Sequence, residues 1–210
     1  MKVSFGEFYA GAYIVWIDKK ITMNKRAKSN TIRIIAGTWR GRRLPVIDSD
    51  GLRPTTDRVR ETLFNWLMGD IAGARCLDLF AGTGALGLEC LSRGAEFVQF
   101  VESEAVAAKV INDNLGNLGV ENSALSVGSA IPFLQHQANK KFNLVFLDPP
   151  FDSNLLSLAL PMLVSNSWLA ESALVYIERG AQGQAIEIPR QWTLHREART
   201  GQSHYALYRV

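Results

Sequence analysis

The sequence predicts an α/β fold: a doubly wound, mostly parallel, seven-stranded sheet with a C-terminal antiparallel hairpin and a small basic β-rich extension at the N-terminus. The first observation behind this prediction is that short apolar runs alternate with amphipathic segments from residue 74 onward, as in βαβ units. The second is that the chain closes with two strand-like runs around a short turn. The length of 210 residues fits one domain of ordinary size.

Five strands are expected in the alternating region, at residues 74–80, 96–102, 123–127, 142–148 and 172–178. Their apolar character is typical of strands buried on both faces of a parallel sheet. The segments between them predict helices near residues 85–93, 104–117, 129–138 and 154–164. The last two strands are expected at residues 192–198 and 203–210, on either side of Thr200-Gly201-Gln202.

Ahead of this region, the apolar and basic side chains of residues 32–44 predict a small β-rich element. Thr55 or Thr56 is then suited to cap a helix, because a threonine hydroxyl accepts a hydrogen bond from a free backbone N–H group of the first turn. The apolar face of this helix is formed by Val59, Leu63, Phe64 and Leu67.

Charge is unevenly distributed along the chain. Residues 19–60 carry twelve Lys and Arg against three Asp and Glu, whereas residues 61–210 carry ten against fifteen. Clustered cations bind polyanions because they displace the counterions of phosphate groups. The basic segment therefore indicates a nucleic-acid partner, with a merely solvated tail as the alternative.

Several other classes of protein are disfavoured. The apolar run of residues 3–17 is interrupted by Glu7, is too short to cross a bilayer and fits a signal peptide poorly. The cysteines and histidines show no metal-ligand spacing; they are Cys76, Cys90, His136, His195 and His204. We expect a cytoplasmic protein with reduced, buried thiols, no metal and no membrane segment.

A glycine-rich loop follows the first strand, in the sequence Asp-Leu-Phe-Ala-Gly-Thr-Gly-Ala-Leu-Gly of residues 78–87. Glycine allows a sharp turn and a close approach to a ligand, and the helix that follows offers free N–H groups. Glu102, at the end of the next strand, is placed to hold ribose hydroxyls of NAD or of S-adenosylmethionine. Asp78 favours the second cofactor, which carries an ammonium and no pyrophosphate, although this carboxylate could also simply brace the loop.

A second motif, Asp148-Pro149-Pro150-Phe151, follows the fourth strand at the edge where α/β sheets bind ligands. The Asp148 carboxylate and the Pro149 carbonyl can accept hydrogen bonds from both protons of an exocyclic amine and direct its lone pair toward a methyl donor. The prolines stiffen the loop, and Phe151 offers a flat face on which a base can stack. A proline-stiffened turn without catalytic function is the alternative.

With these motifs, the chain resembles the class I methyltransferases that carry an (N/D)PP(Y/F) motif. Within them it is similar to the RsmD family, the bacterial 16S rRNA (guanine-N2) methyltransferases whose family name carries guanine-966. The similarity runs from about residue 32 to residue 210. It rests on the runs IRIIAGTWRGRRLP, GLRPTTDRVRETLFNWL, CLDLFAGTGALGLE, LDPPF and LHREARTGQSHYALYR.

The resemblance implies a Rossmann-like fold, S-adenosyl-L-methionine as cofactor, and catalysis by Asp148, Pro149, Pro150 and Phe151. It places the ribose on Glu102 and the adenine beside Ser129 and Ala130, and gives the rest of the cofactor site as Asp78, Phe80, Gly82, Thr83 and Gly84. A larger residue at Gly84 is expected to fill the space that the cofactor needs. Class I enzymes often have an Asp where Ser129 stands, so the adenine amine is expected to be bound either by Ser129 or by backbone groups.

The expected partner is 16S rRNA within the small ribosomal subunit or its assembly intermediate, bound by a monomer. RNA contacts are expected at Arg33, Trp39, Arg40, Arg42, Arg43 and Arg53, and the resemblance adds His195 and Arg196. We accordingly divide the chain into an RNA-binding element with its helix, residues 31–70, and a catalytic domain, residues 71–210. Residues 1–30 are expected to be either a disordered extension or the result of a mis-assigned translation start. Met23 is the more convincing start position.

Other functions stay open at this point. An enzyme with this Asp148–Phe151 motif, which we call the proline loop, could also methylate another planar amine, either the N6 of DNA adenine or a protein glutamine. A NAD-dependent oxidoreductase would explain the glycine loop and Glu102 but leave the proline loop and the basic segment without a role. A non-catalytic RNA-binding protein would explain only the basic segment.

Overall fold

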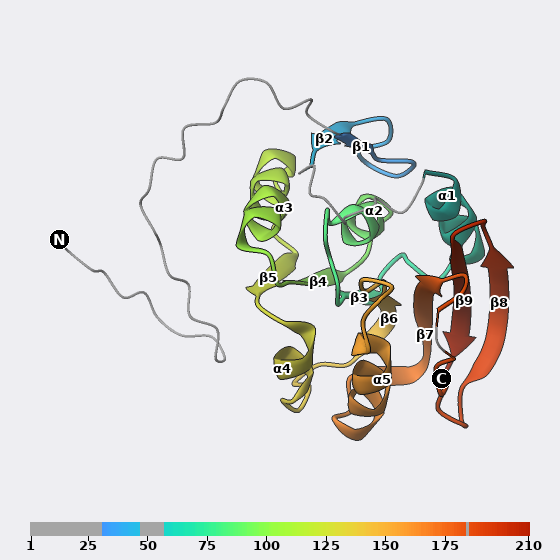
Figure 1. Ribbon diagram of the computed structural model, residues 1–210. Coiled ribbons are helices and arrows are strands. Elements are labelled where there is room, and N and C mark those ends of the chain that lie inside the picture. Colours follow the sequence, from blue (N-terminus) through green and yellow to red (C-terminus); the bar gives the residue numbers. More distant parts are fainter. Residues whose placement is uncertain (1–30, 47–56, 184) are drawn as a thin grey trace.

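The computed structural model describes residues 31–46, 57–183 and 185–210, and Figure 1 shows their arrangement. The expectations for residues 1–30, for Arg53 and for a cap at Thr55 or Thr56 lie outside the described residues. None of the helices in the described ranges combines the length and the apolar character that a membrane span requires.

A seven-stranded sheet forms the centre of the molecule, in the order β5-β4-β3-β6-β7-β9-β8. The first five strands in this order are parallel, whereas β9 runs antiparallel to both of its neighbours. The predicted mostly parallel sheet with a C-terminal hairpin is therefore confirmed. The strands are β3 (Arg75–Asp78), β4 (Phe97–Glu102), β5 (Ser123–Val127), β6 (Phe142–Leu147), β7 (Leu169–Gly180), β8 (Thr193–Arg199) and β9 (Ser203–Arg209).

Helices cover both faces of the sheet. The first face carries α1 (Asp57–Trp66), α2 (Ala85–Ser92) and α3 (Ala105–Leu118), and the second carries α4 (Ala130–Leu134) and α5 (Leu155–Ser165). Successive residues of a strand point to opposite faces, so β6 contributes Phe146 to the first core and Leu147 to the second. Two separate apolar cores result, which is the doubly wound arrangement that the sequence predicts.

Helix α4 is shorter than the predicted helix over residues 129–138. A continuing helix would need the N–H of Ala138 to bind the carbonyl of Leu134. That carbonyl instead accepts hydrogen bonds from the side chains of Asn166 and Trp168, at 2.7 and 3.2 Å. The N–H of Ala138 donates to the carbonyl of Asn166 at 3.1 Å. Tertiary hydrogen bonds therefore replace the helical ones and end α4.

The predicted β-rich element consists of β1 (Thr31–Arg33) and β2 (Arg43–Pro45), which pair antiparallel. It docks on α2, where the buried Glu89 carboxylate accepts hydrogen bonds from the N–H groups of Ile35 and Ala36 at 2.8 and 2.9 Å. Ser92 adds bonds to Trp39 N at 3.0 Å and to the carbonyl of Ala36 at 2.6 Å. Side-chain contacts thus fix this element to the outer side of the helical layer.

Candidate active site

The carboxyl ends of the central strands bring the two predicted motifs to one edge of the sheet. Asp78 pairs in register with Phe100 on β4 and with Phe146 on β6. Glu102 lies two positions beyond Phe100, and Asp148 lies two positions beyond Phe146. The glycine loop, Glu102 and the proline loop therefore share this edge, as the sequence predicts.

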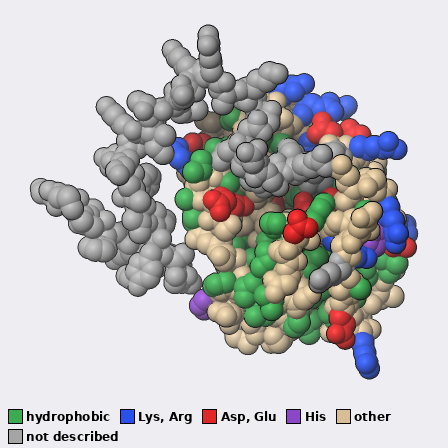
Figure 2. All heavy atoms as spheres, viewed as in Figure 1, with side chains coloured by type: hydrophobic (Ala, Val, Ile, Leu, Met, Phe, Trp, Pro, Cys, Tyr) green, Lys and Arg blue, Asp and Glu red, His purple; other side chains and the backbone are tan. Residues whose placement is uncertain are grey.

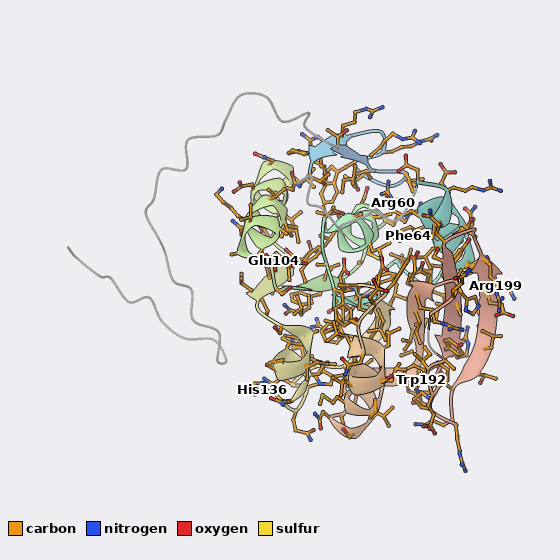
Figure 3. The ribbon with its side chains drawn as sticks, in the orientation of Figure 1. Arg60, Phe64, Glu104, His136, Trp192 and Arg199 are labelled. Atoms are coloured by element: carbon orange, nitrogen blue, oxygen red, sulfur yellow. The ribbon has the colours of Figure 1, made fainter. Side chains whose placement is uncertain are left out.

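Both acidic residues of the glycine loop region are buried and hydrogen-bonded to backbone N–H groups. Asp78 Oδ2 accepts from Gly87 N at 3.0 Å. Glu102 Oε2 accepts from Gly82 N at 2.6 Å, and its Oε1 accepts from Glu104 N at 2.7 Å. Figure 3 labels Glu104 at the start of α3. The two carboxylates brace the loop, and Glu102 joins it to the first turn of α3.

The pKa of Asp78 is raised from 3.8 to about 7. Burial is the largest cause, because a charged carboxylate loses its hydration there. The hydrogen bond from Gly87 N lowers the pKa, and the nearby negative charge of Glu102 raises it further. Asp78 therefore stands near the midpoint of its titration at neutral pH, where a neighbouring cation would favour its charged form.

Gly84 is needed for its backbone conformation and packing rather than for open space beside it. It has a φ of +74° and immediately precedes α2. A Cβ atom at this position would lie 3.1 Å from Ile111 Cγ1 and 3.3 Å from Leu88 Cδ1. The expectation that a larger residue at Gly84 would fill the cofactor's space is therefore wrong in its physical reason, because the side chain would enter the contact between α2 and α3.

The remaining predicted cofactor residues differ in exposure. Phe80 and Thr83 are half-buried, and Ala130 is buried at the start of α4. Ser129 is exposed, and its hydroxyl makes no capping hydrogen bond to α4. The Gly128 N–H donates to the carbonyl of Glu102 at 2.8 Å, which fixes this loop beside the end of β4.

The proline loop is braced by hydrogen bonds and presents an aromatic ring. The carbonyl of Pro150 accepts hydrogen bonds from the backbone N–H and the hydroxyl of Ser153, at 3.1 and 2.7 Å. Asp148 is half-buried, and 43% of Phe151 is exposed. A Cβ atom on Gly180 would lie 3.4 Å from Phe151 Cβ, so Phe151 packs over the end of β7. The loop therefore holds a carboxylate beside a partly exposed ring.

Sequence reasoning missed a buried pair on β7 next to this loop. The Tyr176 hydroxyl donates to Glu178 Oε2 at 2.7 Å. Leu147 pairs with Ile177, so Glu178 comes level with Asp148 on the neighbouring strand. Burial raises the pKa of Glu178, and it raises the pKa of Tyr176 together with the charges of Glu178 and Asp148. The sequence signal that could have revealed this pair is Glu178 itself, an acidic residue at the end of an apolar run.

The predicted RNA-binding residues within the described ranges lie apart from this edge, on the β1–β2 element. Arg40, Arg42 and Arg43 are exposed, and Figure 2 shows Lys and Arg side chains gathered over this part of the molecule. Arg33 is also exposed but lies 3.7 Å from Glu61 in an ion pair. Trp39 is half-buried against the first core, which leaves only part of its ring accessible.

The histidines are distributed over the surface and the sheet. His204 is buried, with Nε2 3.0 Å from Glu197 Oε2. His136 follows α4 and is exposed, and His195 is half-buried on β8. Within the described part of the chain, no group of three or more His, Cys, Asp and Glu side chains has a metal-binding arrangement.

Residues 32–209 match the family model described as Conserved hypothetical protein 95. "Ribosomal RNA small subunit methyltransferase D" of Escherichia coli K12 is 49% identical over 86% of this chain and 90% of the relative. The protein of the same name from Haemophilus influenzae is 47% identical over 84% of this chain and 93% of its own length. A solved structure named "Putative methyltransferase yhhF from Escherichia coli" superimposes with a TM-score of 0.81, at 46% identity, covering 86% of this chain and 98% of that one. The chain therefore belongs to the family of the ribosomal RNA small subunit methyltransferases D.

Proposed function

We propose that this protein transfers a methyl group from S-adenosyl-L-methionine to the exocyclic N2 amine of a guanine in 16S ribosomal RNA, of the guanine-966 type. The observation that carries the proposal is the shared edge of the sheet. There, the Asp148 carboxylate and the exposed ring of Phe151 stand beside a glycine loop braced by two buried carboxylates. The names of the relatives support ribosomal RNA as the substrate.

The residues at the edge fit this cofactor. Glu102 holds the ribose hydroxyls, and Asp78 receives the ammonium group, which favours the charged form of a carboxyl whose pKa lies at about 7. Backbone groups of the loop complete the methionine end, namely those of Phe80, Gly82, Thr83 and Gly84. Ser129 and Ala130 border the adenine, where the exposed Ser129 hydroxyl can accept the bond that an Asp accepts in related enzymes.

The proline loop prepares the target amine. Its nitrogen lone pair is delocalised into the ring, so the amine is a poor nucleophile while it is planar. Asp148 and the Pro149 carbonyl accept hydrogen bonds from its two protons and favour a tetrahedral nitrogen whose lone pair points at the methyl donor. Pro150 limits the loop's freedom, and Phe151 stacks on the base. When bound, the cofactor supplies the electrophilic methyl group.

The direct test is incubation of the protein with labelled cofactor and 16S rRNA, or with small subunits from cells that lack the enzyme. Digestion and mass analysis of the nucleosides should give N2-methylguanosine, with one methyl group per rRNA. Methylated adenine, or label on a ribosomal protein, would contradict the assignment to guanine N2. The comparison of naked rRNA with assembled subunits also identifies which of them is the substrate.

The cofactor is tested independently of any RNA. Calorimetric titration should detect binding of S-adenosylhomocysteine and none of NAD. The Asp148→Ala variant serves as a control, because this residue lies outside the proposed cofactor contacts and should leave the affinity unchanged. Tight binding of NAD would contradict the proposal.

A further inference from the structure

Three basic side chains form a row across the last three strands of the sheet. Arg179 on β7 pairs in register with His204 on β9, which in turn pairs with Arg199 on β8. Directly opposed residues of neighbouring antiparallel strands point to the same face of a sheet. With strands about 4.8 Å apart, the row spans roughly 10 Å between its outer Cα atoms. We call Arg179, His204 and Arg199 the basic row.

The basic row is rigidly connected to the proline loop. Gly180, next to Arg179, packs against Phe151 and pairs with Ser203, next to His204. The turn between β8 and β9 is closed by Thr200, whose hydroxyl accepts from Ser203 N at 2.9 Å. The carbonyl of Gln202 accepts from Ala181 N at 2.9 Å, which joins this turn to the segment after β7. The row therefore keeps a fixed position beside the aromatic ring.

Within the basic row, the charge of Arg199 is available to a ligand. Arg199 is exposed and makes no hydrogen bond or ion pair within the described residues. Glu197, an acidic neighbour on the same strand, has its Oε2 3.0 Å from His204 Nε2. Figure 3 shows Arg199 at the end of β8 that faces the turn, whereas Trp192 lies at the other end of the strand.

The basic row lies next to a cluster of acidic residues at the carboxyl edge of the sheet. Asp78, Glu102, Asp148 and Glu178 all lie at the carboxyl ends of the parallel strands, and those of them that are charged disfavour an approaching polyanion. The positive charge of an arginine offsets this repulsion. Its guanidinium also binds phosphate with directed hydrogen bonds. The β1–β2 element supplies arginines on the outer side of the helices, and the basic row supplies two more beside the proline loop.

We propose that the basic row binds a phosphodiester of the RNA strand next to the target nucleotide, with Arg199 as its principal contact. The inference rests on the proposed function, because it assumes an RNA whose base is held at Phe151. Phosphate contacts position a nucleic acid and carry no sequence information directly. The row therefore sets how far the strand extends past the proline loop, and the proline loop receives the base.

The test compares two charge reversals on the same hairpin. Arg199→Glu changes the basic row. Arg209→Glu is the matched control, because Arg209 is exposed but pairs with Thr193 at the opposite end of β8. We expect Arg199→Glu to weaken the affinity for 16S rRNA about 10-fold and to reduce the salt slope of binding by about one. The control should change the affinity less than about 2-fold, and neither variant should alter binding of S-adenosylhomocysteine.

Two results would overturn the role of the basic row. An equal loss of rRNA affinity in both variants would indicate a general electrostatic attraction. A loss of affinity for assembled subunits, without one for naked rRNA, would indicate a protein partner instead. If Arg199→Glu does not fold, Arg199→Ala and Arg199→Lys replace it. Weak rRNA binding by Arg199→Ala together with near-parental binding by Arg199→Lys supports the proposal. Parental rRNA binding by both variants overturns it. A parent protein that methylates no rRNA would contradict the proposed function itself, whereas a parent that methylates it normally leaves only the row in question.

Discussion

Asp148 is half-buried at the end of β6, level with a second buried acid on the neighbouring strand. Its proposed hydrogen bond to the amine develops fully only as the nitrogen becomes tetrahedral, so its removal should lower turnover more than substrate affinity. By analogy with the loss of one oxyanion donor, Asp148→Ala should slow methylation by about 100-fold or more. The measurement is single-turnover methylation with saturating cofactor and excess enzyme.

Asp148→Asn is the matched variant, because it keeps one acceptor oxygen at the same position. Its rate should fall less than that of Asp148→Ala once the amide turns this oxygen toward the amine. Near-parental rates for a folded Asp148→Ala would mean that the proline loop is only a stiff turn.

Asp78 gives a pH dependence of stability with an unusual sign. Its pKa is about 7 in the folded protein and 3.8 as the reference value for the unfolded chain. The folded state therefore holds more protons between these values, and the contribution of Asp78 to the free energy of unfolding falls as the pH rises from about 4 to about 7. Asp78→Asn should remove this dependence, worth at most roughly 4 kcal/mol.

Urea unfolding of the parent and of Asp78→Asn at pH 4.5 and pH 8 measures this effect. The variant should gain stability relative to the parent at the higher pH, and comparing the two proteins at each pH cancels the other titrating groups. A stability difference that is the same at both pH values would show that the carboxyl titrates normally in the folded state.

Single residues of the site were predictable where the strand order alone decides their position. Glu102 and Asp148 follow apolar strands, and the carboxyl ends of parallel strands must meet at one edge. The direction of a Cβ at Gly84 depends on how α2 packs on α3, and the position of Glu178 depends on the register between β6 and β7. Such three-dimensional contacts leave no periodic signal in the sequence.

At the scale of elements, the docking of β1 and β2 on α2 depends on a close backbone approach at Gly37. This residue has a φ of +82°, and a Cβ atom on it would lie 1.8 Å from the carbonyl oxygen of Ser92. Gly37→Ala should therefore displace the element from α2 and cost roughly 1–3 kcal/mol, through overpacking as well as backbone strain. Urea unfolding measures the cost, and hydrogen exchange at Ile35 and Ala36 reports the displacement.

The Gly41→Ala variant separates the cost of overpacking from the cost of backbone strain. Gly41 has nearly the same φ, +80°, but no atom within 4 Å of an added Cβ, so it carries the backbone strain alone. Gly37→Ala should lose clearly more stability and more protection than Gly41→Ala. Equal effects would show that the contact with Ser92 does not hold the element.

Elements were predictable in type but not in their ends. The apolar run at residues 172–178 predicts a strand, whereas β7 begins at Leu169. Leu169 pairs with Phe142, and the register then shifts before Leu174 pairs with Leu144. Ser172, with a φ of 59°, lies within this irregularity. The polar residues of a bulge interrupt the apolar pattern, so the sequence alone placed the start of the strand too late.

For the whole molecule, the uneven charge of the sequence becomes a spatial arrangement. The exposed arginines of the β1–β2 element lie over the helical layer, while Arg199 lies on the edge strand β8 (Figures 1 and 3). The proposed active site stands at the sheet edge near the second group, where acidic residues gather.

Reversal of Arg40, Arg42 and Arg43 to Glu should weaken the affinity for rRNA and lower the salt slope by about one for each phosphate that is no longer neutralised. Cofactor affinity should stay unchanged, because these residues lie outside the carboxyl edge of the sheet. Sites without shared partners contribute additively to the free energy, so adding Arg199→Glu should multiply the two losses in affinity. Filter binding of 16S rRNA at several salt concentrations measures both quantities. Parental affinity and salt slope in the triple variant would make the element a solubilising surface. A combined loss no larger than either single loss would mean that the two basic regions do not contribute independently to RNA binding.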